Sequence, residues 1–124
     1  MMPHEEWLIK AEHDLQAAVM LKSNSNLLDT SVYHTQQCAE KALKAFLVYH
    51  KREIEKTHHL KPLLDACSAI DHEFFILKKD VIFLSPFAAE FRYPGECLIP
   101  DESDVMSAIT SAEKILYFIK RKFL

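Results

Sequence analysis

Hydrophobic residues recur every three or four positions through most of the chain, which is the spacing of a buried stripe along an α-helix. The clearest case is the segment from Ser31 to Lys51, which contains neither glycine nor proline. When successive residues are placed about 100° apart, as in an α-helix, five apolar residues of this segment fall on one side. They are Val32, Ala39, Ala42, Leu43 and Phe46. The segment therefore predicts a helix of about five turns that buries this side.

The opposite side of the same helix collects groups that exchange protons or make hydrogen bonds. They are Tyr33, His34, Gln37, Glu40, Lys41 and Lys44. Glu40 and Lys44 have the i,i+4 spacing of an ion pair, which is worth only about 0.3 kcal/mol, so helix stability explains little of this composition. Three interpretations are open: a solvated face, which the spacing alone favours, a functional site, and a face that packs against a partner helix.

The chain on either side of this helix also has helical periodicity. A first helix is expected to start near Pro3 and to end in the polar run 23–26, whose side chains compete for backbone hydrogen bonds. We expect Asp29 or Thr30 to cap the second helix and Thr57 to cap a third, because short polar side chains satisfy free N–H groups there.

Three further signals mark helices in the C-terminal part. Asp71 is a candidate cap for a short fourth helix through residues 72–84. Ser85 and Pro86 are typical of a new helix start after a kink. Asp101 is a candidate cap for a last helix with apolar residues at spacings of three and four.

Composition supports an all-α fold. One glycine and five prolines in 124 residues leave few positions for tight turns, and no segment alternates polar and apolar residues as a strand does. We therefore predict an up-and-down bundle of four long helices plus a short fifth, in a single domain spanning residues 1–124.

Charge, cysteine content and hydropathy limit the class of protein. The net charge of −3 argues against strong non-specific binding to nucleic acid but allows a local basic groove. Three distant cysteines, Cys38, Cys67 and Cys97, are typical of reduced thiols in the cytoplasm. The N-terminal residues are acidic and amphipathic, and no apolar run approaches about 18 residues, so we expect neither a signal peptide nor a membrane span.

Several kinds of chemistry are disfavoured by the motifs. The seven histidines include no i,i+4 pair, and the adjacent His58 and His59 point apart on a helix, so we expect no metal site. A single glycine cannot supply a phosphate-binding loop, and no cofactor is expected. No histidine is placed by sequence as a base for the cysteines, which we interpret as small buried residues.

Three clusters remain as candidate sites: the polar side of the second helix, residues 56–60, and residues 90–96. Each has a structural alternative of at least equal weight. Residues 56–60 are also typical of a capped helix start. Arg92 can satisfy the last carbonyls of a helix, which Tyr93 and the following Pro-Gly would then end.

The order of these motifs resembles the HEPN domain (higher eukaryotes and prokaryotes nucleotide-binding domain) over nearly the full chain. The resemblance rests on five motifs that occur in this order. They are Trp7…Ala11…Asp14-Leu15…Ala18, Tyr33-His34-x-Gln36-Gln37-x-x-Glu40-Lys41-Ala42-Leu43-Lys44-Ala45, Thr57-His58-x-Leu60 with Leu63-Leu64, Arg92-Tyr93-Pro94, and an alanine-containing last helix. The resemblance implies a helical bundle that dimerises, with the polar side of the second helix near the dimer cleft. It also implies a small nucleotidyltransferase partner in a toxin–antitoxin pair.

Some HEPN domains are metal-independent endoribonucleases that use an Arg followed, after four to six residues, by a His. This sequence departs from that motif, because Cys97, Leu98 and Ile99 occupy the expected positions after Arg92. Arg52 and His58 have the required spacing, but they lie in the connector after the second helix, and we interpret that pair as coincidental.

Our first hypothesis is therefore a cytoplasmic, homodimeric HEPN-family protein that binds a nucleotide or RNA. The expected phosphate contacts are Arg92, Lys41 and Lys44, and the expected base or ribose contacts are Gln37, His34 and Tyr93. An alternative is an endoribonuclease in which Arg92 holds the phosphate and His34 or His58 acts as acid or base. A second alternative is a non-catalytic dimerisation or docking module.

Overall fold

The computed structural model describes residues 1–54, 56–88, 94 and 99–124, and within them the chain is helical with no strand. The α-helices are α1 (Pro3–Leu21), α2 (Leu28–Tyr49), α3 (Leu60–Ile70), α4 (Lys78–Leu84) and α5 (Glu102–Arg121). Two 3₁₀ helices, η1 (His72–Leu77) and η2 (Ser85–Ala88), flank α4. The prediction of an all-α bundle with four longer helices and a short one is confirmed.

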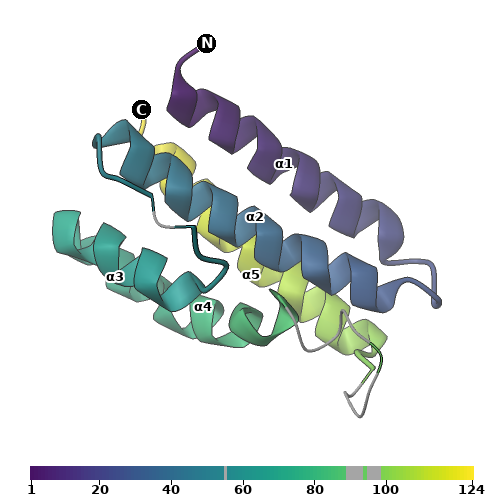
Figure 1. The fold of residues 1–124 in the computed structure, drawn as a ribbon. Helices are drawn as coiled ribbons and strands as arrows, with labels where there is room; N and C mark the ends of the chain where they lie inside the picture. The colour runs from purple at the N-terminus through teal and green to yellow at the C-terminus, as the bar shows by residue number, and fades with distance from the viewer. Residues whose placement is uncertain (55, 89–93, 95–98) are drawn as a thin grey trace.

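Helix α2 is the centre of the bundle. Figure 1 shows it between α1 on one side and α3 with α4 on the other, while α5 runs behind it. Both chain ends lie at the end of the bundle where α2 finishes. Because α2 contacts every other α-helix, almost every side chain that it carries lies close to another element.

The core forms along the predicted apolar side of α2. All five residues of that stripe are buried, and Leu43 is completely so. The small side chains Ala11 and Ala18 of α1 and Ala39 of α2 are also fully buried, which leaves room for two helix backbones to approach closely. Burying a leucine of this kind stabilises the fold by roughly 2 kcal/mol.

Two predicted helix starts were wrong. Helix α2 begins at Leu28, two or three residues earlier than expected, so Asp29 and Thr30 lie inside its first turn and neither is its cap. Helix α3 begins at Leu60 rather than after Thr57, whose hydroxyl instead accepts a hydrogen bond from His59 N at 3.1 Å. His58 and His59 therefore lie in an extended connector that precedes the helix.

The end of α2 sets the direction of this connector. Lys51 has a left-handed backbone with φ of 58°, a conformation that glycine usually provides at a helix end. Its N–H donates to Val48 O and the N–H of Arg52 donates to Leu47 O, both at 2.9 Å. This pair of hydrogen bonds reverses the chain so that it runs back along α2.

Capping predictions in the C-terminal part had mixed outcomes. Asp71 accepts a hydrogen bond from Glu73 N, and Asp101 forms a reciprocal capping box with Asp104, so both caps are confirmed. A new helical turn does begin at Ser85, as predicted, but it is the 3₁₀ helix η2, which follows α4 directly, and the Ser85 hydroxyl donates back to Val81 O at 2.7 Å. The expected stop at Tyr93 lies outside the described residues.

None of the helices in the described part of the chain combines the length and the apolar character that crossing a bilayer requires.

Candidate functional site

The candidate site is the polar side of α2, which we call the α2 polar face and which consists of Tyr33, His34, Gln37, Glu40, Lys41 and Lys44. It is bordered by α1 along one edge and by the connector 56–59 along the other. The expectation of a fully solvated face is wrong, because Glu40 and Lys44 are buried within the chain's own fold. Their burial comes from long-range packing rather than from the helix itself.

Asp14 of α1 organises the first edge of the α2 polar face. Its Oδ1 lies 2.8 Å from His34 Nδ1, and its Oδ2 accepts a hydrogen bond from Lys41 Nζ at 2.7 Å. The Asp14 side chain is only 10% exposed, so this carboxylate is held between a cation and an imidazole. Since a carboxylate accepts hydrogen bonds, the contact favours a proton on Nδ1 of His34. The other ring nitrogen, Nε2, is then available to exchange a proton or make a hydrogen bond with a ligand.

Glu40 organises the second edge in the same way. Its Oε2 accepts from Lys44 Nζ at 3.0 Å, and its Oε1 lies 3.2 Å from His58 Nδ1. The amide of Gln37 adds a longer contact to Oε1 at 3.4 Å. The Glu40 side chain is 4% exposed whereas that of His58 is 78% exposed, so a buried carboxylate orients an imidazole that faces solvent.

Each buried carboxylate thus joins one histidine and one lysine. A histidine whose Nδ1 is held by a carboxylate is oriented to exchange a proton or make a hydrogen bond through Nε2. His34 and His58 are placed at the two edges of the α2 polar face by these contacts. The structure brings five of the candidate residues to one region: His34, Gln37, Lys41, Lys44 and His58.

The two lysines differ in how far they can reach a ligand. Lys44 is buried, with its Nζ 5.6 Å from the centre of the Trp7 ring, in a cation–π contact, and paired with Glu40. Lys41 is paired with Asp14, but its side chain is 26% exposed. Lys41 is therefore the better placed of the two to contact a phosphate.

Two predicted site residues, Arg92 and Tyr93, lie outside the described residues. Their position relative to the α2 polar face stays a prediction. Asp14 was not predicted as a site residue. The available signal was an acidic residue among the apolar positions Ala11, Leu15 and Ala18 of the first helix.

The described cysteines are not part of this site. Cys38 and Cys67 are buried free thiols, which confirms their interpretation as small core residues. Burial raises the pKa of both thiols, and that of Cys67 rises to about 12. Because the thiolate is the reactive form, neither is suited to nucleophilic chemistry at neutral pH. Cys97 lies outside the described residues.

Comparison with solved structures supports the fold. The crystal structure of ST0689, an archaeal HEPN homologue, matches with a TM-score of 0.78 and 28% identity, over 100% of both chains. The crystal structure of TT1696 from Thermus thermophilus matches with a TM-score of 0.82 over 98% of this chain and 99% of that one. Its identity of 21% supports similarity of fold alone.

A curated protein of Methanocaldococcus jannaschii, named a putative toxin, is 51% identical to this chain over 39 residues. This stretch covers 32% of the chain and only 25% of that protein's length. The family model of the HEPN domain, by contrast, matches residues 4–122. On the strength of that nearly complete match, the chain belongs to the HEPN domain family.

Proposed function

We propose that this HEPN-domain protein binds a nucleotide or a segment of RNA on the α2 polar face. The supporting observation is that Asp14 and Glu40, two largely buried carboxylates, each hold one histidine and one lysine there. Buried ion pairs are often no more stabilising than apolar residues of similar size. Stability therefore does not explain two carboxylates that each hold a histidine and a lysine on one helix face. Binding of a ligand explains them, because oriented imidazoles and cations can contact its phosphate, base or ribose.

In this proposal Lys41 and Arg92 contact phosphate, while Lys44 holds Glu40 in place from behind. His34, Gln37 and Tyr93 supply hydrogen bonds and a ring to the base or ribose. Because the whole chain carries a net charge of −3, binding depends on this local arrangement rather than on general attraction to phosphate.

We further propose that the protein acts in the cytoplasm as one member of a toxin–antitoxin pair, with a small nucleotidyltransferase as the other, and that it is a homodimer. Membership of the HEPN family and local similarity to a protein named as a toxin support this role. In the dimer, the α2 polar face borders the cleft between the two subunits. A non-catalytic docking module remains the alternative if no ligand binds.

One observation favours RNA cleavage as a second candidate function. The carboxylates of Glu40 and Asp14 hold Nδ1 of His58 and His34, as expected for a histidine that exchanges protons at Nε2. Arg92 would hold the phosphate in such a reaction. The absence of histidine at Cys97, Leu98 and Ile99 weighs against the usual HEPN arrangement.

The test is binding of nucleotides and single-stranded RNA by the purified protein, alone and together with a small nucleotidyltransferase. We expect binding by the protein alone, and Arg92→Ala should weaken it with little loss of melting temperature. Arg92→Lys should restore it only partly, because an ammonium lacks the bidentate fork of the guanidinium. RNA cleavage in EDTA that is lost in Arg92→Ala would support the nuclease. A large fall in melting temperature with unchanged affinity would show that Arg92 is structural.

A further inference from the structure

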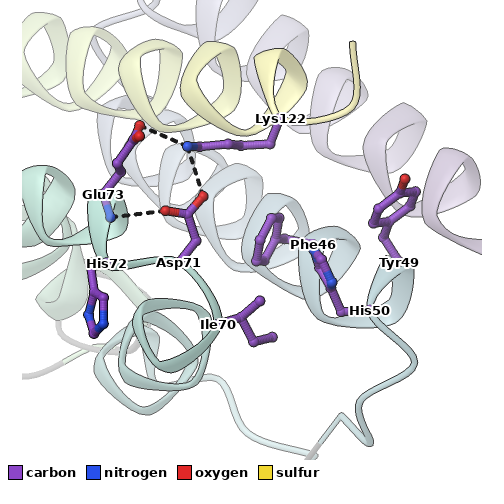
Figure 2. A pocket seen from close by; sticks show the side chains of 8 residues that line it. All are labelled: Phe46, Tyr49, His50, Ile70, Asp71, His72, Glu73 and Lys122. Carbon is purple, nitrogen blue, oxygen red and sulfur yellow. Dashed lines mark hydrogen bonds and ion pairs between the residues drawn. The ribbon is translucent and has the colours of Figure 1, made fainter.

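A pocket separate from the α2 polar face opens at the end of the bundle where α2 finishes. Figure 2 shows its lining, which comes from the end of α2, the α3–η1 junction and the end of α5. The lining residues are Phe46, Tyr49, His50, Ile70, Asp71, His72, Glu73 and Lys122. Its volume of about 570 Å³ lies within the range of small-ligand sites.

The C-terminal ends of three helices border this pocket. Helix α2 ends at Tyr49, α3 at Ile70 and α5 at Arg121, and each of these residues lines the pocket or precedes a residue that does. The C-terminal end of a helix acts as roughly half a negative charge, because its last carbonyls have no partner within the helix. These three ends outnumber the single helix start at the pocket, the N-terminal end of η1, and so favour a cation there.

The side chains add further negative charge. Lys122 Nζ lies 2.8 Å from Asp71 Oδ2 and 2.9 Å from Glu73 Oε2, so one ammonium is shared by two carboxylates (Figure 2). The pKa of Asp71 is lowered by its hydrogen bond to Lys122, which keeps this carboxylate charged. The cations Lys51 and Arg52 directly follow His50 in the sequence, but neither lines the pocket, so neither is counted in the charge of its lining. One negative side-chain charge therefore remains uncompensated, in addition to the helix ends.

The remaining walls are hydrocarbon and aromatic. The ring of His50 lies 4.5 Å from that of Phe46 and 5.1 Å from that of Tyr49, and Ile70 faces the same space. The described residues contain no group of three His, Cys, Asp or Glu side chains arranged to hold a metal ion. These walls suit the alkyl part of an organic cation better than a hydrated metal ion.

We propose that this pocket binds a small aliphatic polyamine, a molecule whose ammonium groups are joined by alkyl chains. One ammonium contacts the carboxylate of Asp71 beside Lys122 and the Oε1 of Glu73, since Lys122 engages Glu73 through Oε2. The alkyl chain lies against Phe46 and Ile70, and a second ammonium faces the helix ends. This site is independent of the nucleotide or RNA proposed for the α2 polar face, so either proposal can fail without the other.

The first test is titration calorimetry with spermidine at about 0.15 M salt, where weak long-range attraction is largely screened. Glu73 is 75% exposed at its side chain, so Glu73→Gln should fold normally and weaken binding about threefold. Asp71→Asn should weaken it about tenfold, as expected for a charged hydrogen bond that is better shielded from water. Asp65→Asn is the matched control, because it removes the same charge from an exposed position on α3.

The second test uses a variant that should bind spermidine more tightly rather than more weakly. Lys122→Met removes the chain's own ammonium and frees both carboxylates, so spermidine should bind about threefold more tightly. Lys114→Met, which removes the same charge two turns earlier on α5, should not reproduce that gain. Weaker binding in Lys122→Met, equal losses in Asp71→Asn and Asp65→Asn, or Mg²⁺ binding as tightly as spermidine would each overturn the proposal.

Discussion

His58 Nδ1 lies 3.2 Å from Glu40 Oε1, although His58 belongs to no helix and Glu40 is a buried residue of α2. A second contact fixes the same residue, because Gln36 Nε2 donates to the backbone carbonyl of His58 at 2.9 Å. Together the two contacts hold the connector between α2 and α3 against the side of α2. This connector therefore forms one edge of the α2 polar face.

The pair between Glu40 and Lys44 should be important for stability because both partners are buried. We expect Glu40→Gln to lower the free energy of unfolding by about 3 kcal/mol, since it leaves the ammonium of Lys44 without its counter-charge. The double variant Glu40→Gln/Lys44→Met should recover part of that loss. Urea unfolding followed by circular dichroism measures both differences.

Lys61 and Asp65 provide the control for this prediction. They form an i,i+4 pair at 3.0 Å on α3, but both side chains are more than half exposed. Asp65→Asn should change the free energy of unfolding by less than about 0.5 kcal/mol. If Glu40→Gln were as mild as Asp65→Asn, the Glu40–Lys44 pair would have to be solvated in solution.

The buried thiols should be unreactive in the folded protein. With its pKa raised to about 12 by burial, Cys67 has only about one thiolate in 10⁴ molecules at pH 8. In a Cys97→Ser variant, labelling of Cys38 and Cys67 by a disulfide reagent should be at least about 100-fold slower in buffer than in urea. Labelling at the unfolded rate would show that the α2 core opens readily.

The contact between Asp71 and Lys122 should depend on pH at both extremes. The pKa of Asp71 is lowered from 3.8, so its contribution is complete above that value and is lost as pH falls through the folded-state pKa. The pKa of Lys122 is raised from 10.5, so its contribution is complete below 10.5 and is lost as pH rises beyond it.

Lys122→Met tests this pH dependence without added polyamine. Its deficit in the free energy of unfolding should be constant between about pH 5 and 10 and should shrink outside that window. Exposed pairs contribute below about 1 kcal/mol, so urea midpoints measured at several pH values are the suitable observable. A deficit that stays constant down to pH 3 would mean that Asp71 and Lys122 do not interact in solution.

Local sequence patterns predicted the helices and some of their ends. Asp71 and Asp101 cap helices through residues two or three positions away, so the necessary information is contained in a short segment. Asp29 and Thr57 carry the same kind of side chain but do not cap helices. At those positions the helix boundary follows the packing of neighbouring apolar residues, such as Leu28 and Leu60, which are buried.

The candidate site was only partly predictable because its contacts are long-range. Spacing along α2 correctly grouped His34, Gln37, Lys41 and Lys44 on one side. It did not indicate that Asp14 would lie between His34 and Lys41, because that contact depends on the register of α1 against α2. Nor did it indicate the burial of Lys44, to which Trp7 and the pairing with Glu40 contribute.

The most direct test of the central proposal is the salt dependence of RNA binding by Lys41→Ala, compared with Lys114→Ala. Both variants remove one positive charge, but Lys114 lies on α5 and pairs with Asp80 rather than with the α2 polar face. Fluorescence anisotropy of a labelled single-stranded RNA, measured over a range of KCl concentrations, gives the affinity and its slope against salt. We predict that Lys41→Ala weakens binding and reduces the slope by about 0.7, the value for one lost phosphate contact, while Lys114→Ala leaves both unchanged. Equal affinity and equal slope in Lys41→Ala and the unaltered protein would contradict the assignment of the α2 polar face as the binding site.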